Sequence, residues 1–424
     1  MPSGEKTVKP QLICPAGNEQ KLKYAFAYGA DAVYAGPPSI SLRANLNQYD
    51  LPMLERSIRY AHTAGKKLFV TANIFAHEHD LDEVEKTLRA AAELGPDAFI
   101  ISDPGLLRLV RRLKIETPVH LSTQANVTNS ESVGFFSDLG VKRVILAREL
   151  GFREIMRIRE RCMNVELEIF VHGALCVSYS GRCLLSDLLA GRDANRGECA
   201  GTCRWKYYLV EEKRPGELHP IEEDSKGTYI LNSRDLNLLG ELDRMKPLRI
   251  DGYKIEGRTK NILYVALAAR AYRRELDRVY GDGRQDGNDD DSRFLRMTDN
   301  HGFTKGFLFR QSGSMQNVHE KDRGKQSVAG FIRDFRENDI HVEIKNPLSR
   351  GDVLTAVSPV ETFRVKVMEL YENGTPIRQA FGSKKQFVRM VTDRRFKDEG
   401  WNYGILIREQ PPAESSSTSG PNVR

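Results

Sequence analysis

The stretch QLICPAGNEQKLKYAFAYGADAVYAG, residues 11–36, contains the unit that is repeated along this 424-residue chain. It has an apolar run at 11–16, a segment of helical period at 18–28 and a second apolar run at 32–36. Continuous apolar runs are typical of parallel strands that are buried on both faces. The stretch therefore predicts a strand, a helix and a second strand of one parallel sheet.

The same alternation continues to about residue 280. Apolar runs that predict strands lie at 11–16, 32–36, 67–73, 98–103, 119–123, 143–150, 167–172 and 252–256. Segments of helical period lie at 18–28, 54–63, 81–94, 105–113, 130–139, 152–162, 235–245 and 260–278. Eight strand-then-helix units predict an α/β fold, a (β/α)8 TIM-like barrel over residues 1–280. A doubly wound open sheet is the alternative, because periodicity cannot show whether a sheet closes.

The connection after the seventh predicted strand is an insertion at 172–234, far longer than the two to six residues that are usual there. It contains four of the six cysteines, Cys176, Cys183, Cys199 and Cys203. Its second half predicts two short strands, at 207–212 and 228–231. Since such barrels place their active sites at the carboxyl ends of the strands, we expect the cysteines at that mouth.

The cysteine spacing is Cys176-x6-Cys183-x15-Cys199-x3-Cys203. In a reducing compartment this grouping favours metal ligation over disulfides. Four thiolates can bind either zinc or an iron–sulfur cluster, and the spacing leaves both open, together with inert buried cysteines. Cys14, at the end of the first strand, is interpreted as a small buried apolar residue.

A second domain is expected after the barrel. Residues 281–292 are acidic and glycine-rich and predict a linker, residues 293–410 predict a small all-β, barrel-like domain, and residues 411–424 predict a disordered tail. The strands of this domain are expected at 327–334, 340–344, 353–356, 361–370, 386–391 and 404–407.

The net charge of +6 is concentrated in the second domain, which suggests an anionic partner there. Residues 293–409 contain 21 basic and 15 acidic side chains, whereas residues 1–292 contain 42 of each. The candidate RNA-binding residues surround Phe387 and Phe396 and are Lys384, Lys385, Arg389, Arg394, Arg395 and Lys397. Basic and aromatic residues interleaved in this way bind phosphates and bases. The competing interpretation, favoured for Phe387, is a core phenylalanine flanked by solvated charges.

The extremes of the chain and its hydropathy argue against a membrane protein. No apolar run approaches the length of a membrane span, and the first ten residues lack the apolar block of a secretory signal. We therefore expect a soluble, cytoplasmic protein.

Several motifs carry a resemblance to a known family. EIFVHGALC at 168–176 and GRCLLS at 181–186 resemble the signature of the collagenase-like peptidase family U-32. Further motifs that resemble this family are LICPAG at 12–17, DAVYAG at 31–36, CAGTCRW at 199–205, KIEGR at 254–258 and NHGFTKGF at 300–307. The resemblance covers residues 11–408 and implies that the four clustered cysteines bind a 4Fe-4S cluster.

Within that family, one barrel followed by one short β-domain most resembles the members that hydroxylate tRNA. This resemblance implies hydroxylation of the wobble uridine in the tRNA anticodon loop to 5-hydroxyuridine, with prephenate as co-substrate. A flipped base is read by stacking and by hydrogen bonds to its edge, and arginine binds carboxylates through two parallel hydrogen bonds. The candidate substrate-binding residues, all near strand ends or in the insertion, are Gln124, Asn126, Arg148, Arg204, Lys254 and Arg258.

Two residues are candidates for catalysis, His172 for proton relay and Glu256 beside the cationic groups. Each has a plainer interpretation: His172 as a satisfied strand-end histidine, and Glu149 and Glu256 as salt-bridge partners of the arginines and the lysine at the barrel rim.

Proteolysis is the alternative activity. The sequence has no Gly-x-Ser-x-Gly elbow, and His77-Glu78-His79 lacks the four-residue spacing of a zinc protease helix. A non-catalytic iron–sulfur RNA-binding protein is the other alternative, and the sequence predicts no oligomeric state.

Overall fold

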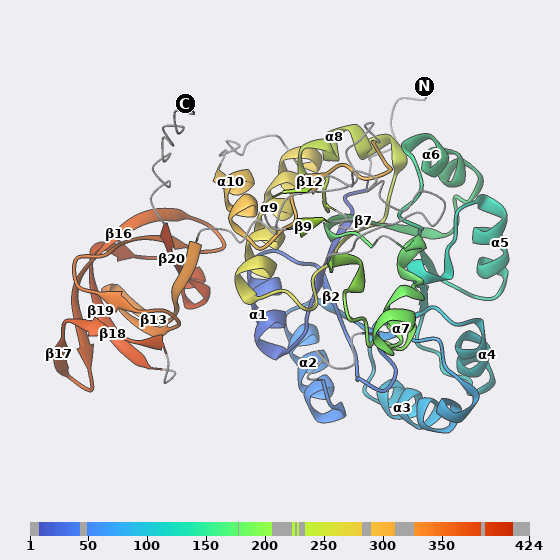
Figure 1. Cartoon of the computed structure of the whole chain (residues 1–424), viewed down its shortest axis with the longest axis horizontal. Helices are drawn as coiled ribbons and strands as arrows, with labels where there is room; N and C mark the ends of the chain where they lie inside the picture. Colours follow the sequence, from blue (N-terminus) through green and yellow to red (C-terminus); the bar gives the residue numbers. More distant parts are fainter. Residues whose placement is uncertain are drawn as a thin grey trace, which may run out of the picture. The chain divides into compact units, whose positions relative to one another are not determined.

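The computed structural model describes residues 8–42, 49–176, 178–205, 223–224, 227–228, 234–281, 290–309, 326–382 and 386–409. The chain forms two compact units, Met1–Arg323 and Gly324–Arg424. In Figure 1 the colours run along the whole chain, from blue at the N-terminus to red at the C-terminus.

The first unit is a closed barrel of eight parallel strands. These are β1 (Gln11–Pro15), β2 (Ala32–Ala35), β3 (Lys67–Ala72), β4 (Ala98–Ile101), β5 (Val119–Leu121), β6 (Arg143–Ile145), β7 (Glu166–Ala174) and β11 (Gly252–Ile255). Each pairs in parallel with the next, and β11 pairs with both β7 and β1. The predicted (β/α)8 barrel is therefore confirmed, and the open sheet is excluded.

Helices cover the outside of these strands (Figure 1). They are α1 (Glu19–Ala27), α2 (Leu51–Thr63), α3 (Leu81–Glu93), α4 (Pro104–Arg112), α5 (Ser130–Asp138), α6 (Phe152–Arg161) and α9 (Ile262–Tyr280). Their starts follow local chemistry: side-chain oxygens of Asn18, Asp50, Asp103, Asn129 and Asn261 accept hydrogen bonds from backbone amides of the first turn. None of the helices in the described part of the chain is both long and apolar enough to cross a membrane.

The predicted helix at 235–245 is wrong over its first half. Asp235–Asn237 forms strand β10, antiparallel to the end of β7, and only Leu242–Met245 is α-helical, as α8. The nine-residue β7 extends beyond its neighbours, so its free edge is available for pairing. Leu236, on the short strand, and Leu239, in the turn after it, are both buried.

The insertion between β7 and β10 contains α7 (Leu185–Ala190) and several 3₁₀ turns. In the second half of the insertion, up to residue 233, the structure describes only two paired antiparallel strands of two residues each, β8 (Glu223–Asp224) and β9 (Gly227–Thr228). The predicted strand at 207–212 and most of that at 228–231 lie outside the described residues.

The boundary of the second domain differs from the predicted residue 293. Helix α10 (Asp290–Met297) packs on α9, where Arg270 and Asp291 form a buried ion pair at 3.3 Å. Strand β12 (Phe303–Thr304) pairs in parallel with β10. Residues 293–309 therefore belong to the barrel unit, while 282–289 of the predicted linker and the tail at 411–424 lie outside the described residues.

The second unit is a small closed antiparallel barrel. Its strands are β13 (Gln326–Ile344), β15 (Val353–Val357), β16 (Thr362–Glu372), β19 (Phe387–Phe396) and β20 (Ile405–Glu409), in the order β15-β20-β13-β19-β16 and closed by β15 against β16. Short strands β14 (Leu348–Ser349), β17 (Thr375–Ile377) and β18 (Gln379–Ala380) lie at its margins. The predicted strands at 327–334 and 340–344 are one strand, bent where Glu337 has a φ of 55° and the register shifts.

Candidate active site at the carboxyl ends of the barrel strands

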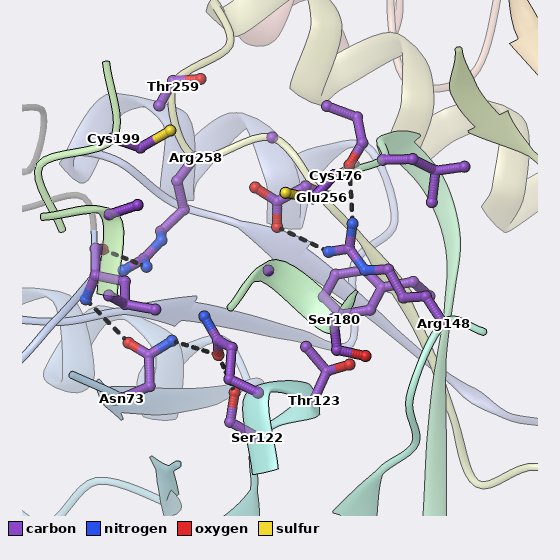
Figure 2. Close-up of a pocket in the computed structure, with 18 of the residues that line it drawn as sticks. Asn73, Ser122, Thr123, Arg148, Cys176, Ser180, Cys199, Glu256, Arg258 and Thr259 are labelled. Carbon is purple, nitrogen blue, oxygen red and sulfur yellow. Dashed lines mark hydrogen bonds and ion pairs between the residues drawn. The ribbon is translucent and has the colours of Figure 1, made fainter. Parts of the chain in front are cut away.

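A cavity of about 330 Å³ lies at the carboxyl ends of the barrel strands (Figure 2). Its wall combines strand-end residues with residues of the insertion. Five of the predicted catalytic and substrate-binding residues line it: Gln124, Arg148, Lys254, Glu256 and Arg258. Polar strand ends thus converge on one mouth, as the position rule for such barrels predicts.

Arg148 is held at the cavity wall by three contacts. Its Nη1 donates to the carbonyl oxygen of Ala174 at 2.8 Å, and its guanidinium lies 3.8 Å from the centre of the Phe170 ring. Its Nη2 is 3.8 Å from Oε2 of Glu256, so the rim pairing expected for these two residues is present but long (Figure 2). A planar cation fixed in this way is suited to bind a carboxylate.

Arg258 is more deeply placed and only 7% exposed. It donates to Oγ1 of Thr71 at 3.0 Å and to the carbonyl oxygen of Leu42 at 2.5 Å. The backbone beside it approaches Gly17 so closely that a Cβ on Gly17 would lie 2.5 Å from the Arg258 carbonyl oxygen. A glycine in the first strand-to-helix turn therefore permits the close approach of the Arg258 backbone.

Lys254 differs from the expected rim ion pair. Its Nζ lies 2.8 Å from Oε1 of Glu168, and both side chains are almost completely buried. Glu168 also contacts Arg143 at 3.1 Å. Burial opposes ionisation of Glu168, but Lys254 and Arg143 outweigh it and lower its pKa to about 2. The predicted partner Glu149 instead accepts hydrogen bonds from the backbone N–H and the hydroxyl of Ser180, both at 2.6 Å.

His172 lies behind the cavity wall and does not line the cavity. It is 1% exposed and surrounded by the rings of Tyr264, Tyr272 and Phe303. Burial lowers its pKa to about 4, so the ring is neutral at physiological pH. The structure therefore gives His172 no direct contact with a ligand in the cavity. It does not match a satisfied histidine either: Nδ1 lies 3.4 Å from the Tyr272 hydroxyl, and the buried Nε2 has no hydrogen-bond partner among the described residues.

The other predicted substrate residues fall elsewhere. Asn126 adopts a left-handed conformation after β5 and does not line the cavity. The side chain of Arg204 lies outside the described part of the structure.

Tyr34 and Thr71 line the cavity but escaped the sequence analysis. The Tyr34 hydroxyl donates to the carbonyl oxygen of Ile255 at 3.0 Å and lies 3.3 Å from Oε2 of Glu256. Both are polar residues within mostly apolar strands, β2 and β3, and this polarity was the signal that could have revealed them.

The four clustered cysteines all line this cavity. Cys183 is buried, and Asn195 bonds both its backbone N–H, at 3.2 Å, and its carbonyl oxygen, at 3.0 Å. All six cysteines of the chain are described, and none forms a disulfide. Four thiols facing one cavity have the composition that an iron–sulfur cluster requires.

The spacing of these thiols is not that of a bound metal. Figure 2 shows Cys176 and Cys199 on different parts of the cavity wall. Among the residues that the structure describes, no three His, Cys, Asp or Glu side chains lie close enough together to hold an ion. The donor set fits a cluster in kind, and the insertion would have to draw the sulfurs together to bind one.

The candidate RNA-binding residues of the second unit are only partly described. Lys384 and Lys385 lie outside the described residues, and Arg394, Arg395 and Lys397 are exposed on and after β19. Arg389 pairs with Asp339 at 2.7 Å and lies 4.0 Å from the centre of the Tyr371 ring.

The two phenylalanines of this region have opposite environments. Phe387 is 60% exposed, so its interpretation as a core residue is wrong, whereas Phe396 is 2% exposed and packs on Trp401.

The fold and the cavity define a (β/α)8-barrel protein with arginines and thiols at its carboxyl-terminal mouth. A model described as "Peptidase family U32" matches residues 17–317. The chain therefore belongs to peptidase family U32, as its motifs predicted.

Three of the similar proteins have names that state an activity. The chain is 38% identical over 397 residues to "tRNA hydroxylation protein P" of Escherichia coli, covering 83% of this chain and 86% of that protein. It is 30% identical over 371 residues to "23S rRNA 5-hydroxycytidine C2501 synthase" of E. coli, covering 85% and 54%. It is 31% identical over 316 residues to "Collagenase" of Porphyromonas gingivalis, covering 71% and 74%.

Proposed function

We propose that this protein hydroxylates RNA, and specifically that it converts the wobble uridine of tRNA to 5-hydroxyuridine with prephenate as co-substrate. One observation carries the proposal: the cavity at the barrel mouth joins Arg148 and Arg258 to all four cysteines of the insertion. Similarity to the tRNA hydroxylation protein over most of both chains supports tRNA as the RNA.

In this proposal the arginines bind the acidic co-substrate. Arg148, fixed on Phe170 and on the Ala174 carbonyl, presents its guanidinium to one carboxylate, and the buried Arg258 presents positive charge on the opposite wall. Anion binding costs either arginine little side-chain entropy, because contacts within the barrel already hold its side chain. Glu256 lies between Tyr34 and Arg148 and can accept a hydrogen bond from a donor group of prephenate or of the RNA base.

We further propose that Cys176, Cys183, Cys199 and Cys203 bind a 4Fe-4S cluster. Such a cluster supplies one-electron chemistry beside the substrate, or rigidity to the loop that holds it. Asn195, which bonds the backbone on both sides of Cys183, positions one of the four thiols.

The second unit is proposed to bind the tRNA backbone. Exposed Arg394, Arg395 and Lys397 supply positive charge, and exposed Phe387 on the same strand, β19, offers a stacking surface. Affinity for tRNA should then fall steeply as salt rises.

The test is nucleoside mass spectrometry of tRNA from a strain that lacks the gene, complemented with the wild type, Cys183→Ala or Cys162→Ala. Cys162 ends α6, outside the insertion, and is the matched control. We expect 5-hydroxyuridine with the wild type and Cys162→Ala and its loss, together with loss of bound iron, with Cys183→Ala.

The same strains separate the alternative functions. Unchanged tRNA nucleosides in the gene-deleted strain would refute hydroxylation and leave an iron–sulfur RNA-binding protein. Cleavage of gelatin by purified protein after removal of iron would instead favour a peptidase, the activity named for the P. gingivalis relative.

A further inference from the structure

A chain of hydrogen bonds with a fixed direction runs from the backbone to Gln124 at the cavity. The backbone N–H of Leu42 can only donate, and it lies 3.1 Å from Oδ1 of Asn73. The amide nitrogen of Asn73 must then face the other way, where it donates to Oε1 of Gln124 at 3.3 Å (Figure 2). The orientation of both amides follows from one backbone donor.

Two buried hydroxyls donate to the same oxygen of Gln124 in this orientation. Ser122 lies 2.6 Å and Ser102 lies 3.3 Å from the same Oε1 of Gln124, and the two serines are 3% and 0% exposed. Three side chains from the ends of β3, β4 and β5 thus surround one oxygen. Reversing the Gln124 amide would place its NH₂ against the NH₂ of Asn73, which cannot accept a hydrogen bond.

The remaining atom of the amide, Nε2, has no hydrogen-bond partner among the described residues, although Gln124 lines the cavity and is partly exposed. We infer that Gln124 is a specificity-determining residue that donates from Nε2 to an oxygen of the bound ligand, a carbonyl or a carboxylate. A ligand that presents an amino group at this point would meet a donor and be rejected. The inference rests on the proposed function only in the choice of the two ligands that are used to test it.

Two substitutions replace the hydrogen-bond donor that faces the cavity with an acceptor, each in a different way. Gln124→Glu puts an oxygen where Nε2 stands while keeping the shape of the side chain. Asn73→Asp leaves Gln124 in place but puts an acceptor where Asn73 had a donor, so the Gln124 amide turns and presents Oε1 to the cavity. Gln20→Glu makes the same chemical change on α1, away from the cavity, and is the matched control.

The experiment is calorimetric titration of each purified full-length protein with prephenate and, separately, with a tRNA anticodon stem-loop that carries the wobble uridine. Wild-type hydroxylation is measured in parallel, and circular dichroism checks that each variant is folded. We expect both cavity variants to weaken binding of the same ligand by about tenfold or more, because a buried polar group of the ligand loses its partner. Gln20→Glu should remain within about twofold, as is usual for surface changes.

The ligand whose binding is weakened identifies the source of the acceptor: prephenate indicates one of its carboxylate or keto oxygens, and the stem-loop indicates an oxygen of the RNA. Wild-type affinity for both ligands in both cavity variants, or no binding of either ligand by the wild type, would overturn the inference. If the variants lose binding but the wild type makes no 5-hydroxyuridine, the proposed function fails and the role of Gln124 stands.

Discussion

Replacing Glu168 by glutamine should destabilise the barrel by an amount that shrinks as the pH rises. The substitution keeps the shape of a side chain that is 0% exposed but removes its charge. Lys254, 2.8 Å away and equally enclosed, then has a buried ammonium without that carboxylate. Arg143 still has Glu166 as an ion-pair partner, at 2.6 Å, so Lys254 is the cation that the substitution affects most.

The magnitude follows from the choice open to Lys254. Leaving one charge of a buried pair alone typically costs about 3–5 kcal/mol. The lysine can avoid this by losing its proton, which from an unfolded pKa of about 10.4 costs about 4.6 kcal/mol at about pH 7 and about 1.9 kcal/mol at about pH 9. The free-energy cost of deprotonating Lys254 is therefore an upper limit on the loss of stability, and this limit falls as the pH rises.

The sign agrees with proton linkage. Burial already lowers the pKa of Lys254, and loss of Glu168 lowers it further. The unfolded variant then binds more protons than the folded one between neutral pH and the unfolded pKa of lysine, so its stability rises with pH. Glu168 itself, with a pKa of about 2, stays ionised throughout this range in the wild type and adds no slope.

Urea unfolding followed by far-ultraviolet circular dichroism is the assay, because every α-helix in the described residues belongs to the barrel unit. Glu166→Gln, two residues earlier on β7, is the matched control; its carboxylate is partly exposed, so we expect a loss of roughly 1 kcal/mol without pH dependence. A loss below about 1 kcal/mol for Glu168→Gln, or the same loss at both pH values, would refute the reasoning.

Three further predictions concern single side chains. Gly173→Ala should destabilise the barrel by about 1–3 kcal/mol and reduce hydroxylation, because the φ of 103° disfavours alanine and the Cβ would lie 2.3 Å from the Glu256 carbonyl oxygen; thermal unfolding and product yield check it. Trp401→Ala should destabilise the small β-barrel by about 3–5 kcal/mol, since the ring is 0% exposed and its N–H donates to Glu361 at 2.8 Å; unchanged unfolding of this unit by urea would contradict that. Arg148→Lys should raise the KM for prephenate about tenfold by removing the planar fork and the contact with Phe170, and an unchanged KM would exclude Arg148 from co-substrate binding.

The barrel could be predicted from sequence because its strands are buried on both faces. That burial produces continuous apolar runs, and eight of them coincide with β1–β7 and β11. The same reasoning placed the cysteines at the mouth, since only chain order and the direction of the strands are needed.

Partner identity was harder to predict, because it depends on distances between elements. The apolar run that predicts β11 does not show that Lys254 contacts Glu168 of β7 rather than a residue at the rim. The leucines near residue 236 fit a helix and a short strand equally well until the free edge of β7 is known. Phe387 and Phe396 lie nine residues apart on β19 and so on opposite faces of the strand, and Phe396 shares the buried face with Val388 and Met390.

The two ends of the cysteine-containing insertion are direct neighbours, since Ala174 and Asp235 face each other in the pairing of β7 with β10. A loop whose ends are already joined can change in length at little entropic expense, because closure entropy grows only with the logarithm of length. Replacing the insertion with a tight turn between these two residues should therefore leave a folded barrel that lacks the four clustered thiols. Evolution, or a protein engineer, could in this way give the same scaffold a different reaction.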